Sequence, residues 1–343
     1  MSHKNIPIFI PHLGCPNACV FCNQRVISGR TRFDESDVKR QLEEATATLR
    51  EGDEAEIAFF GGSFTGIDRA LMVRLLEMAD EYVERGTVGA VRCSTRPDYI
   101  DGEVLEILKD HHVRTVELGL QCLDDRVLAA CRRGHDTAAA DRACRLIKEA
   151  GLSLVGQMMI GLPGADGAVE RVTAAHICDL GADGARVYPT VVFRQTELCD
   201  MARRGEYVPL SEEEAIRRTR DVLDLFDRRG VPVIRVGLCA SENLASDEEV
   251  YGGPNHPALG ELAMGELFFD RACEAFGRLP DARPGDAART VTLFVPRGAA
   301  SRAAGQKKRN LLRLYEKYSA PKGINRIKIL EKSELIGYNI IIN

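Results

Sequence analysis

No stretch of this sequence approaches the roughly 20 consecutive apolar residues that a membrane-spanning helix needs. The first residues, MSHKNIPIFIPHLG, are too short and too often interrupted by proline to form an export signal. We therefore expect a cytoplasmic protein without a membrane partner. The chain has 343 residues, 45% of them hydrophobic and 28% charged, which is typical of a globular protein. Its length favours one large domain with an appendage.

The sequence also lacks a disulfide pattern. It has 11 cysteines, and in a chain without an export signal we expect them to be reduced. Most occur singly in apolar or helical patterns, as small buried side chains do: Cys93, Cys122, Cys131, Cys144, Cys178, Cys199, Cys239 and Cys273. The other three share one short stretch, GCPNACVFCNQ, in the pattern C-x3-C-x2-C.

These three thiols, Cys15, Cys19 and Cys22, suit a metal centre better than a disulfide, because their number is odd. A structural zinc site needs a fourth ligand, and His12 is the only nearby candidate. Three thiolates match a [4Fe–4S] cluster with one iron left without a protein ligand. Zinc remains the alternative at this point.

Short apolar runs alternate with amphipathic segments along most of the chain. Seven such runs precede residue 240: 6–13, 56–64, 88–97, 113–121, 152–163, 184–193 and 231–238. Strands separated by helices predict a parallel sheet, and their number favours a partial or full (β/α) barrel with its chemistry at the carboxyl ends of the strands. We predict a barrel core over residues 1–240, a loop, helix and linker over 241–285, and a small α+β appendage over 286–343.

The cysteine pattern, with Phe21 before the third cysteine, resembles that of the radical S-adenosylmethionine (SAM) superfamily. The resemblance implies a [4Fe–4S] cluster, S-adenosyl-L-methionine bound to its open iron, a 5′-deoxyadenosyl radical, and an external electron donor such as flavodoxin or ferredoxin. FFGGSF, VELGLQ, RRGHD and QMMIGLPG resemble later segments of that core. The resemblance thereby implies these cofactor contacts: Phe21, Gly61, Gly62, Ser63, Ser94, Glu117, Gln121, Arg133, Gln157, Gly161 and Leu162.

Among these contacts, Arg133 stands where relatives bind the methionine carboxylate, and Gln157 where they place a polar group on the ribose. Two positions depart from the pattern of the superfamily. Many relatives carry Asp at the position of Gln157, and Glu is frequent at the position of Ser94.

STRPDYI, VELGLQ, RRGHD and the stretch from RVYPTVVFRQ to SEEEAIRR resemble the Elongator catalytic subunit family, which modifies the wobble uridine of tRNA. The resemblance covers roughly residues 5–240. It suggests Tyr188 and Arg194 as substrate contacts, although rim packing and a surface salt bridge explain them equally well. That family continues into an acetyltransferase domain, for which the roughly 100 residues after the core offer no pyrophosphate loop. We therefore do not expect acetyl transfer by this chain, and the residues do not indicate the carbon donor.

Positive charge is concentrated near the end of the chain. Between residues 297 and 332 there are 11 Lys or Arg and two acidic residues, whereas the whole chain carries a net charge of −5. This suggests an RNA partner, with backbone phosphates meeting Lys307, Lys308, Arg309 and Arg313. GQKK resembles only half of the GxxG loop of KH modules, and a solvated basic helix is the alternative. His256 and Glu261 belong either to a helix cap or to an active-site lid.

The leading hypothesis is a radical SAM enzyme that modifies a uridine in tRNA or another RNA. A small metabolite or porphyrin-like substrate is the second hypothesis, because the core also resembles relatives of oxygen-independent coproporphyrinogen oxidase. A noncatalytic RNA-binding or cluster-sensing protein is the third.

Overall fold

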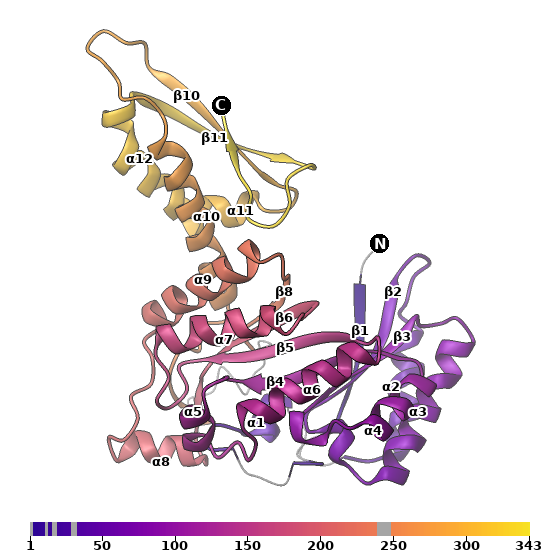
Figure 1. Ribbon diagram of the computed structural model, residues 1–343. Coiled ribbons are helices and arrows are strands. Elements are labelled where there is room, and N and C mark those ends of the chain that lie inside the picture. Colours follow the sequence, from indigo (N-terminus) through magenta and orange to yellow (C-terminus); the bar gives the residue numbers. More distant parts are fainter. Residues whose placement is uncertain (1–2, 11–12, 16–18, 29–32, 239–247) are drawn as a thin grey trace.

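The computed structural model of the protein describes residues 3–10, 13–15, 19–28, 33–238 and 248–343. Seven parallel strands form one sheet in the order β1-β2-β3-β4-β5-β6-β8. They are β1 (His3–Phe9), β2 (Glu54–Phe60), β3 (Ala90–Thr95), β4 (Val113–Gln121), β5 (Ser153–Ile160), β6 (Gly184–Pro189) and β8 (Val233–Val236). Because β1 and β8 are the sheet's two edges, the predicted barrel is confirmed in its partial form (Figure 1).

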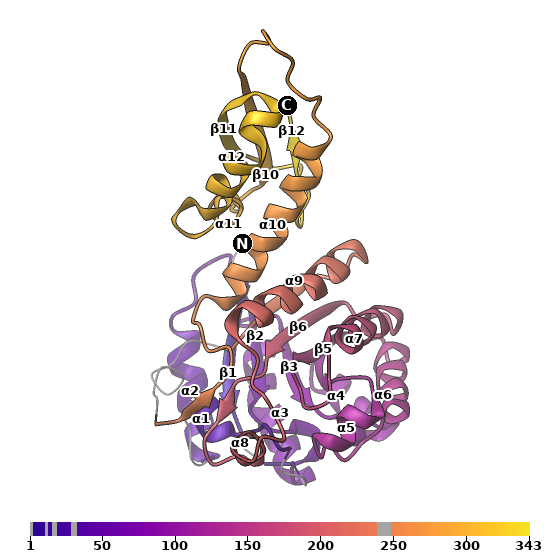
Figure 2. The ribbon, with the colours of Figure 1, turned by 90° about the vertical axis from the view of Figure 1, so that its left-hand side faces the viewer.

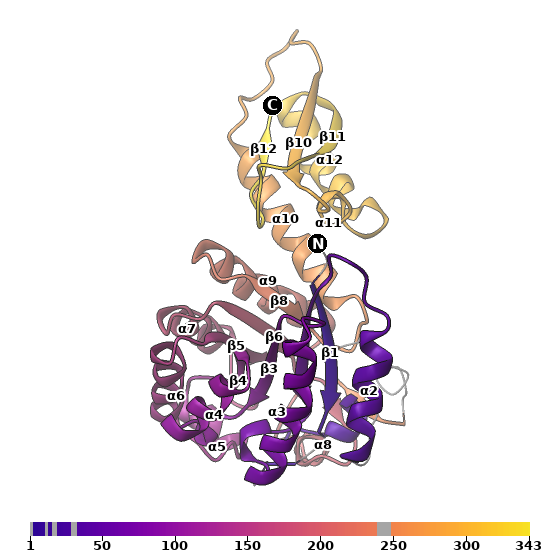
Figure 3. The same cartoon turned by 90° about the vertical axis from the view of Figure 1, so that its right-hand side faces the viewer.

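Helices between the strands cover the convex face of this sheet (Figures 1 and 3). They are α2 (Ser36–Thr46), α3 (Arg69–Glu84), α4 (Gly102–Asp110), α6 (Thr137–Glu149), α7 (Gly167–Asp179) and α9 (Glu212–Arg228). Aspartates cap several of them, as Asp101 does for α4 by accepting a hydrogen bond from the backbone of Val104. The N-caps of α3, α6 and α7 are likewise aspartates.

Alternation along the strands divides the side chains between two faces. In β4, Val116, Leu118 and Leu120 are fully buried and belong to the large core under the helices. Their neighbours Glu117, Gly119 and Gln121 face the concave side. The same division in the other strands leaves polar and aromatic groups on the concave face.

Shorter elements lie around the carboxyl ends of the strands. These are α1 (Gln24–Ser28), α5 (Asp125–Ala130), α8 (Glu197–Arg203), and the antiparallel pair β7 (Val192–Phe193) and β9 (Val250–Gly252). The backbone of Val20, in the loop after β1, bonds to Cys131 at the end of α5 and to Leu198 in α8. These two helices therefore lie beside the cysteine loop.

The C-terminal part forms a separate unit at the end of α10 (Leu259–Gly277), which packs along α9 (Figure 2). Its sheet has the order β11-β10-β12 and is accompanied by two helices. The elements are β10 (Arg289–Pro296), α11 (Ala300–Ala304), α12 (Arg309–Lys322), β11 (Ile324–Lys332) and β12 (Ile341–Ile342). They enclose a core of their own, so the predicted α+β appendage is present.

This C-terminal unit lies at the end of the molecule opposite to α5 and α8 (Figure 1). Among the described residues, no helix is both long and apolar enough to cross a membrane. The predicted boundary at residue 240 and Cys239 both fall outside the described residues.

Candidate active site

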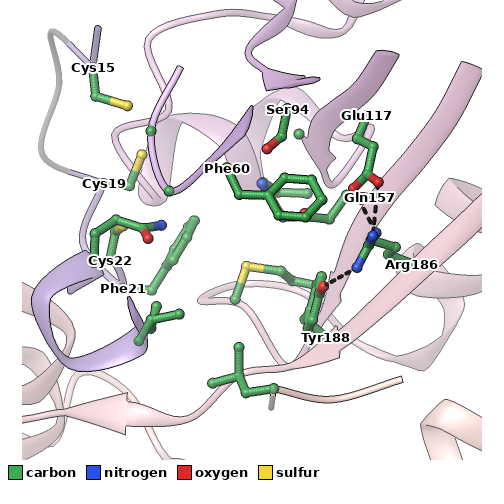
Figure 4. A pocket seen from close by; sticks show the side chains of 18 of the residues that line it. Cys15, Cys19, Phe21, Cys22, Phe60, Ser94, Glu117, Gln157, Arg186 and Tyr188 are labelled. Carbon is green, nitrogen blue, oxygen red and sulfur yellow. Dashed lines mark hydrogen bonds and ion pairs between the residues drawn. The ribbon is translucent and has the colours of Figure 1, made fainter. Parts of the chain in front are cut away.

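A cavity of about 490 Å³ occupies the concave face of the sheet. Most of the predicted site residues line it: Cys15, Cys19, Phe21, Cys22, Gly61, Gly62, Ser94, Glu117, Gln121, Arg133, Gln157 and Tyr188. The three cysteines lie at one end, and Glu117, Arg186 and Tyr188 lie at the other, with Phe60 between them (Figure 4). The cavity therefore has a sulfur-rich end and an arginine-rich end.

The cysteine loop follows β1, and Cys22 N–H donates a hydrogen bond to Cys19 O at 3.0 Å. Cys19 is buried, Cys22 is half-buried and Cys15 is exposed. Burial, with smaller contributions from Cys19 and Cys15, raises the pKa of the Cys22 thiol to about 12. Thiolates at this loop therefore need positive charge nearby, which a bound metal cluster provides. Among the described residues, no three His, Cys, Asp or Glu side chains close around a single metal ion.

Two buried arginines stand beside Cys19. Arg133 Nη1 donates to Cys19 Sγ at 3.3 Å, and Arg96 Nη1 lies 4.0 Å from the same sulfur. Arg133 Nη2 donates to Gly119 O at 2.5 Å, while its Nε is buried with no hydrogen-bond partner in the described part of the chain. These cationic groups and the unpaired donor fit an anionic cluster and a carboxylate ligand at this end of the cavity.

The glycines after β2 are required by a close approach of two loops. A Cβ on Gly62 would lie 2.4 Å from Leu13 O and 2.7 Å from Ile10 O, both backbone atoms. Gly61 has φ +99°, in the region that favours glycine. The loop after β2 thus contacts the backbone that follows β1 directly. This contact explains why glycine is needed at both positions, whether or not a ligand also approaches them.

At the other end, Glu117 of β4 is 2% exposed and pairs with two arginines. Its Oε1 accepts from Arg92 Nη1 at 2.9 Å and from Arg186 Nη2 at 2.8 Å. Arg186 Nε lies 2.6 Å from Oε2 but is not aligned for a hydrogen bond. Arg92 is paired in turn with Glu56 at 2.7 Å. The predicted cofactor contact Glu117 is therefore part of a buried ion-pair chain.

Tyr188 completes the arginine-rich end. Its hydroxyl accepts a hydrogen bond from Arg186 Nη1 at 3.3 Å, and burial raises its pKa. Arg235 of β8 is the register partner of Arg186 and also lines the cavity. Because burial raises the pKa of Tyr188 above its ordinary value, the phenol stays neutral at physiological pH.

Four predicted residues do not line the cavity. Ser63 is buried and hydrogen-bonded to Thr95 at 2.9 Å, and Leu162 belongs to the core beside Cys19 and Phe21. Gly161 donates its N–H to Glu170 at 2.7 Å and accepts from Tyr207 OH at 2.7 Å. Arg194, a predicted substrate contact, stacks on Tyr251 with 5.8 Å between its Cζ and the ring centroid.

The predicted RNA contacts lie in the C-terminal unit. Lys307, Lys308 and Arg309 are exposed, and the two lysines adopt left-handed backbone angles, with φ of +50° and +62°. Arg313 instead pairs with Glu266 of α10 at 2.7 Å and stacks on Phe269. This arginine holds α12 against α10.

His256 and Glu261 both have contacts near the start of α10. His256 Nδ1 accepts from Ala258 N at 3.0 Å, at the turn before α10. Glu261 pairs with Arg302 of α11 at 2.7 Å. These contacts place both residues at the start of α10, whose N-terminus has no side-chain cap among the described residues, so both interpretations stay predictions.

The sequence analysis missed Arg186, Arg235, Arg96 and Phe60 as cavity residues. A signal was present for the first two, because each is a charged residue within an otherwise apolar strand, in GARVYP and VIRV. Charged side chains in such strands are rarely buried without a partner or a function. Phe60 gave no such signal, since an aromatic residue at a strand end is ordinary core material.

The sequence matches two family profiles and several proteins of known name. A profile of the radical SAM superfamily matches residues 9–171, and one of the radical SAM C-terminal domain matches residues 182–267. A tRNA uridine(34) acetyltransferase of Methanocaldococcus jannaschii is 38% identical over 131 residues, which are 37% of this chain and 24% of that protein. One from Dehalococcoides mccartyi is 24% identical over 239 residues, or 60% and 52% of the two chains. The chain thus spans only part of these relatives.

The fold is similar to that of Methanocaldococcus infernus Elp3, with a TM-score of 0.60 and 22% identity over 80% of this chain and 63% of that one. At this identity the similarity concerns the fold alone.

Proposed function

This chain belongs to the radical SAM superfamily, and we propose that it is an enzyme that modifies a uridine base of tRNA with a radical formed from S-adenosylmethionine. The observation that carries the proposal is the cavity that joins three thiols and two arginines at one end to an ion-paired, partly aromatic end at the other. The tRNA substrate is suggested by the named activity of the acetyltransferase relatives.

The residues at the sulfur-rich end fit a [4Fe–4S] cluster. Cys15, Cys19 and Cys22 would hold it, and Arg133 and Arg96 would offset the negative charge beside Cys19. When bound, such a cluster supplies the electron, received from an external donor such as flavodoxin or ferredoxin, that cleaves S-adenosylmethionine to methionine and a 5′-deoxyadenosyl radical.

The chain's own residues then have binding and shielding roles. Arg133, with its unpaired Nε, would bind the methionine carboxylate, and Gln157 and Gln121, 3.4 Å apart through their amides, would bind hydroxyl groups. Apolar side chains of the cavity, such as Phe60, Met159 and Phe193, would exclude water from the reacting atoms.

The substrate is tested by comparing tRNA nucleosides from cells with and without the gene by mass spectrometry. We expect one modified uridine to disappear on deletion and to return with the intact gene, but not with a Cys19→Ala gene. Unchanged nucleosides in the deletion strain would reject a tRNA substrate.

A further inference from the structure

The arginine-rich end of the cavity has features of a ligand site. It is formed by Glu117, Arg186, Tyr188 and Arg235, which come from β4, β6 and β8. In Figure 4 the labelled members of this group lie away from the three cysteines, on the far side of Phe60. A cluster and cofactor at the sulfur-rich end would leave this end to the substrate.

Arg186 is held in a fixed orientation. Glu117 contacts its Nε and Nη2, and the Glu117 carboxylate is itself held by Arg92, which is paired with Glu56. A guanidinium has five N–H groups, and Arg186 directs one from Nη2 to Glu117 and one from Nη1 to Tyr188. Each Nη atom therefore has a further N–H group to offer a ligand, in a plane that the ion pairs determine.

Charge and register make this end rich in hydrogen-bond donors. Arg186 and Arg235 are direct partners across β6 and β8, and Tyr188 is two residues further along the same face of β6. Guanidinium N–H groups can donate but not accept hydrogen bonds, so they favour carbonyl oxygens over an amino group, which also donates.

Phe60 supplies an aromatic surface beside these donors. The Cζ of Arg186 lies over this ring, 5.4 Å from its centroid. Unpaired bases contact aromatic side chains while their edges form hydrogen bonds, so a base packed beside Phe60 would have the Arg186 guanidinium within reach of its edge.

We propose that Arg186, Tyr188 and Arg235, oriented through Glu117, bind the imide edge of a uracil base. This edge presents a carbonyl, an N–H and a second carbonyl: the arginines donate to the two oxygens, and the Tyr188 oxygen accepts from the N–H. Cytosine has an amino donor where uracil has a carbonyl, so it would turn a donor toward an arginine. The inference rests on the proposed action on a uridine and assigns the residues that select it.

The test compares two short hairpin RNAs that differ by a single uridine or cytidine in an adenosine-rich loop. Dissociation constants are measured by fluorescence anisotropy under anoxia for the reconstituted protein, for Arg186→Gln and for Arg114→Gln. Arg114 is an exposed arginine of β4 and serves as the matched control. The ratio of the two constants does not depend on the fraction of protein that folds, so a poorly folding variant still gives a result.

We expect the wild-type protein and Arg114→Gln to prefer the uridine hairpin by about ten-fold, and Arg186→Gln to bind both within about two-fold. Equal binding of both hairpins by the wild-type protein, or a preference that survives in Arg186→Gln, overturns the inference while leaving action on RNA intact. Failure to bind either hairpin overturns the inference together with the proposed RNA substrate.

Discussion

Two charged residues near the arginine-rich end of the cavity are buried together with ion-pair partners. Glu117 and Arg92 are nearly buried charges within apolar strands, and each has a partner of opposite charge. Removing one member of such a pair leaves a buried charge without compensation, which costs several kcal/mol. The motifs predicted that Glu117 faces the site, but its partners could not be read from sequence because they come from β3 and β6.

Gly62 gives a prediction about the contact between the two loops. Gly62→Ala should lower the free energy of unfolding by about 1–3 kcal/mol, because the new Cβ meets backbone oxygens that cannot move independently. Gly102→Ala is the control, since a Cβ at this first residue of α4 meets no atom within 4 Å. Urea unfolding of both variants measures the difference, and equal stability would contradict the close approach.

The partly buried His135 predicts how the stability of the fold changes at acidic pH. Burial, together with the charge of Arg133, lowers its pKa from 6.5 to about 4, and its Nε2 is buried without a partner among the described residues. The unfolded chain therefore takes up this proton first, so stability present above pH 6.5 is lost as the pH falls from 6.5 toward 4. Urea unfolding of the iron-free protein at several pH values should show a shallower loss in His135→Gln. Parallel curves for the two proteins would refute this role.

At the scale of elements, the seven strands of the large sheet were predictable because each is an apolar run followed by a helix. The pair β7 and β9 was not, since two- and three-residue strands carry no periodicity. The cysteine loop, the glycine turn and RRGHD were recognised as motifs. Their meeting in one cavity follows from the parallel order of the sheet, in which the carboxyl ends of the strands share one edge.

The loop after β5 shows how neighbouring elements position a predicted cofactor segment. Gly161 is held by Glu170 of α7, which pairs with Arg218 of α9, and by the hydroxyl of Tyr207. The loop therefore depends on two helices and the segment between α8 and α9.

Removing the Tyr207 hydroxyl should loosen this loop. Tyr207→Phe should destabilise the protein by about 0.5–1.5 kcal/mol, because the bond to Gly161 O is lost, and should weaken S-adenosylmethionine binding measured by calorimetry. Tyr251→Phe keeps the ring that Arg194 and Arg203 contact and should leave both quantities unchanged. Unaltered affinity in Tyr207→Phe would separate this loop from the cofactor.

At the scale of the whole molecule, the basic C-terminal unit lies beyond α10, at the end of the molecule opposite to α5 and α8 (Figures 1 and 3). If the proposed RNA substrate is bound, we expect the exposed lysines at the start of α12 to contact a part of it other than the base in the cavity. This arrangement was not predictable from sequence, because it depends on the direction in which α10 packs on α9.

Charge reversal tests that role. Lys307→Glu combined with Lys308→Glu should weaken tRNA binding and reduce by about two the slope of log affinity against log salt concentration. A control pair with the same change in charge, Lys39→Glu and Lys109→Glu on α2 and α4, should leave the slope nearly unchanged. Equal slopes in all three proteins would exclude a phosphate contact at these lysines.

Formation of 5′-deoxyadenosine tests the central claim most directly. The protein is reconstituted with iron and sulfide under anoxia, reduced with dithionite and supplied with S-adenosylmethionine, and the product is quantified by mass spectrometry. We predict 5′-deoxyadenosine from the wild-type protein and from Cys144→Ala, whose thiol is buried in α6, but none from Cys22→Ala. A wild-type protein that holds its full complement of iron and sulfide yet releases no 5′-deoxyadenosine would contradict the account.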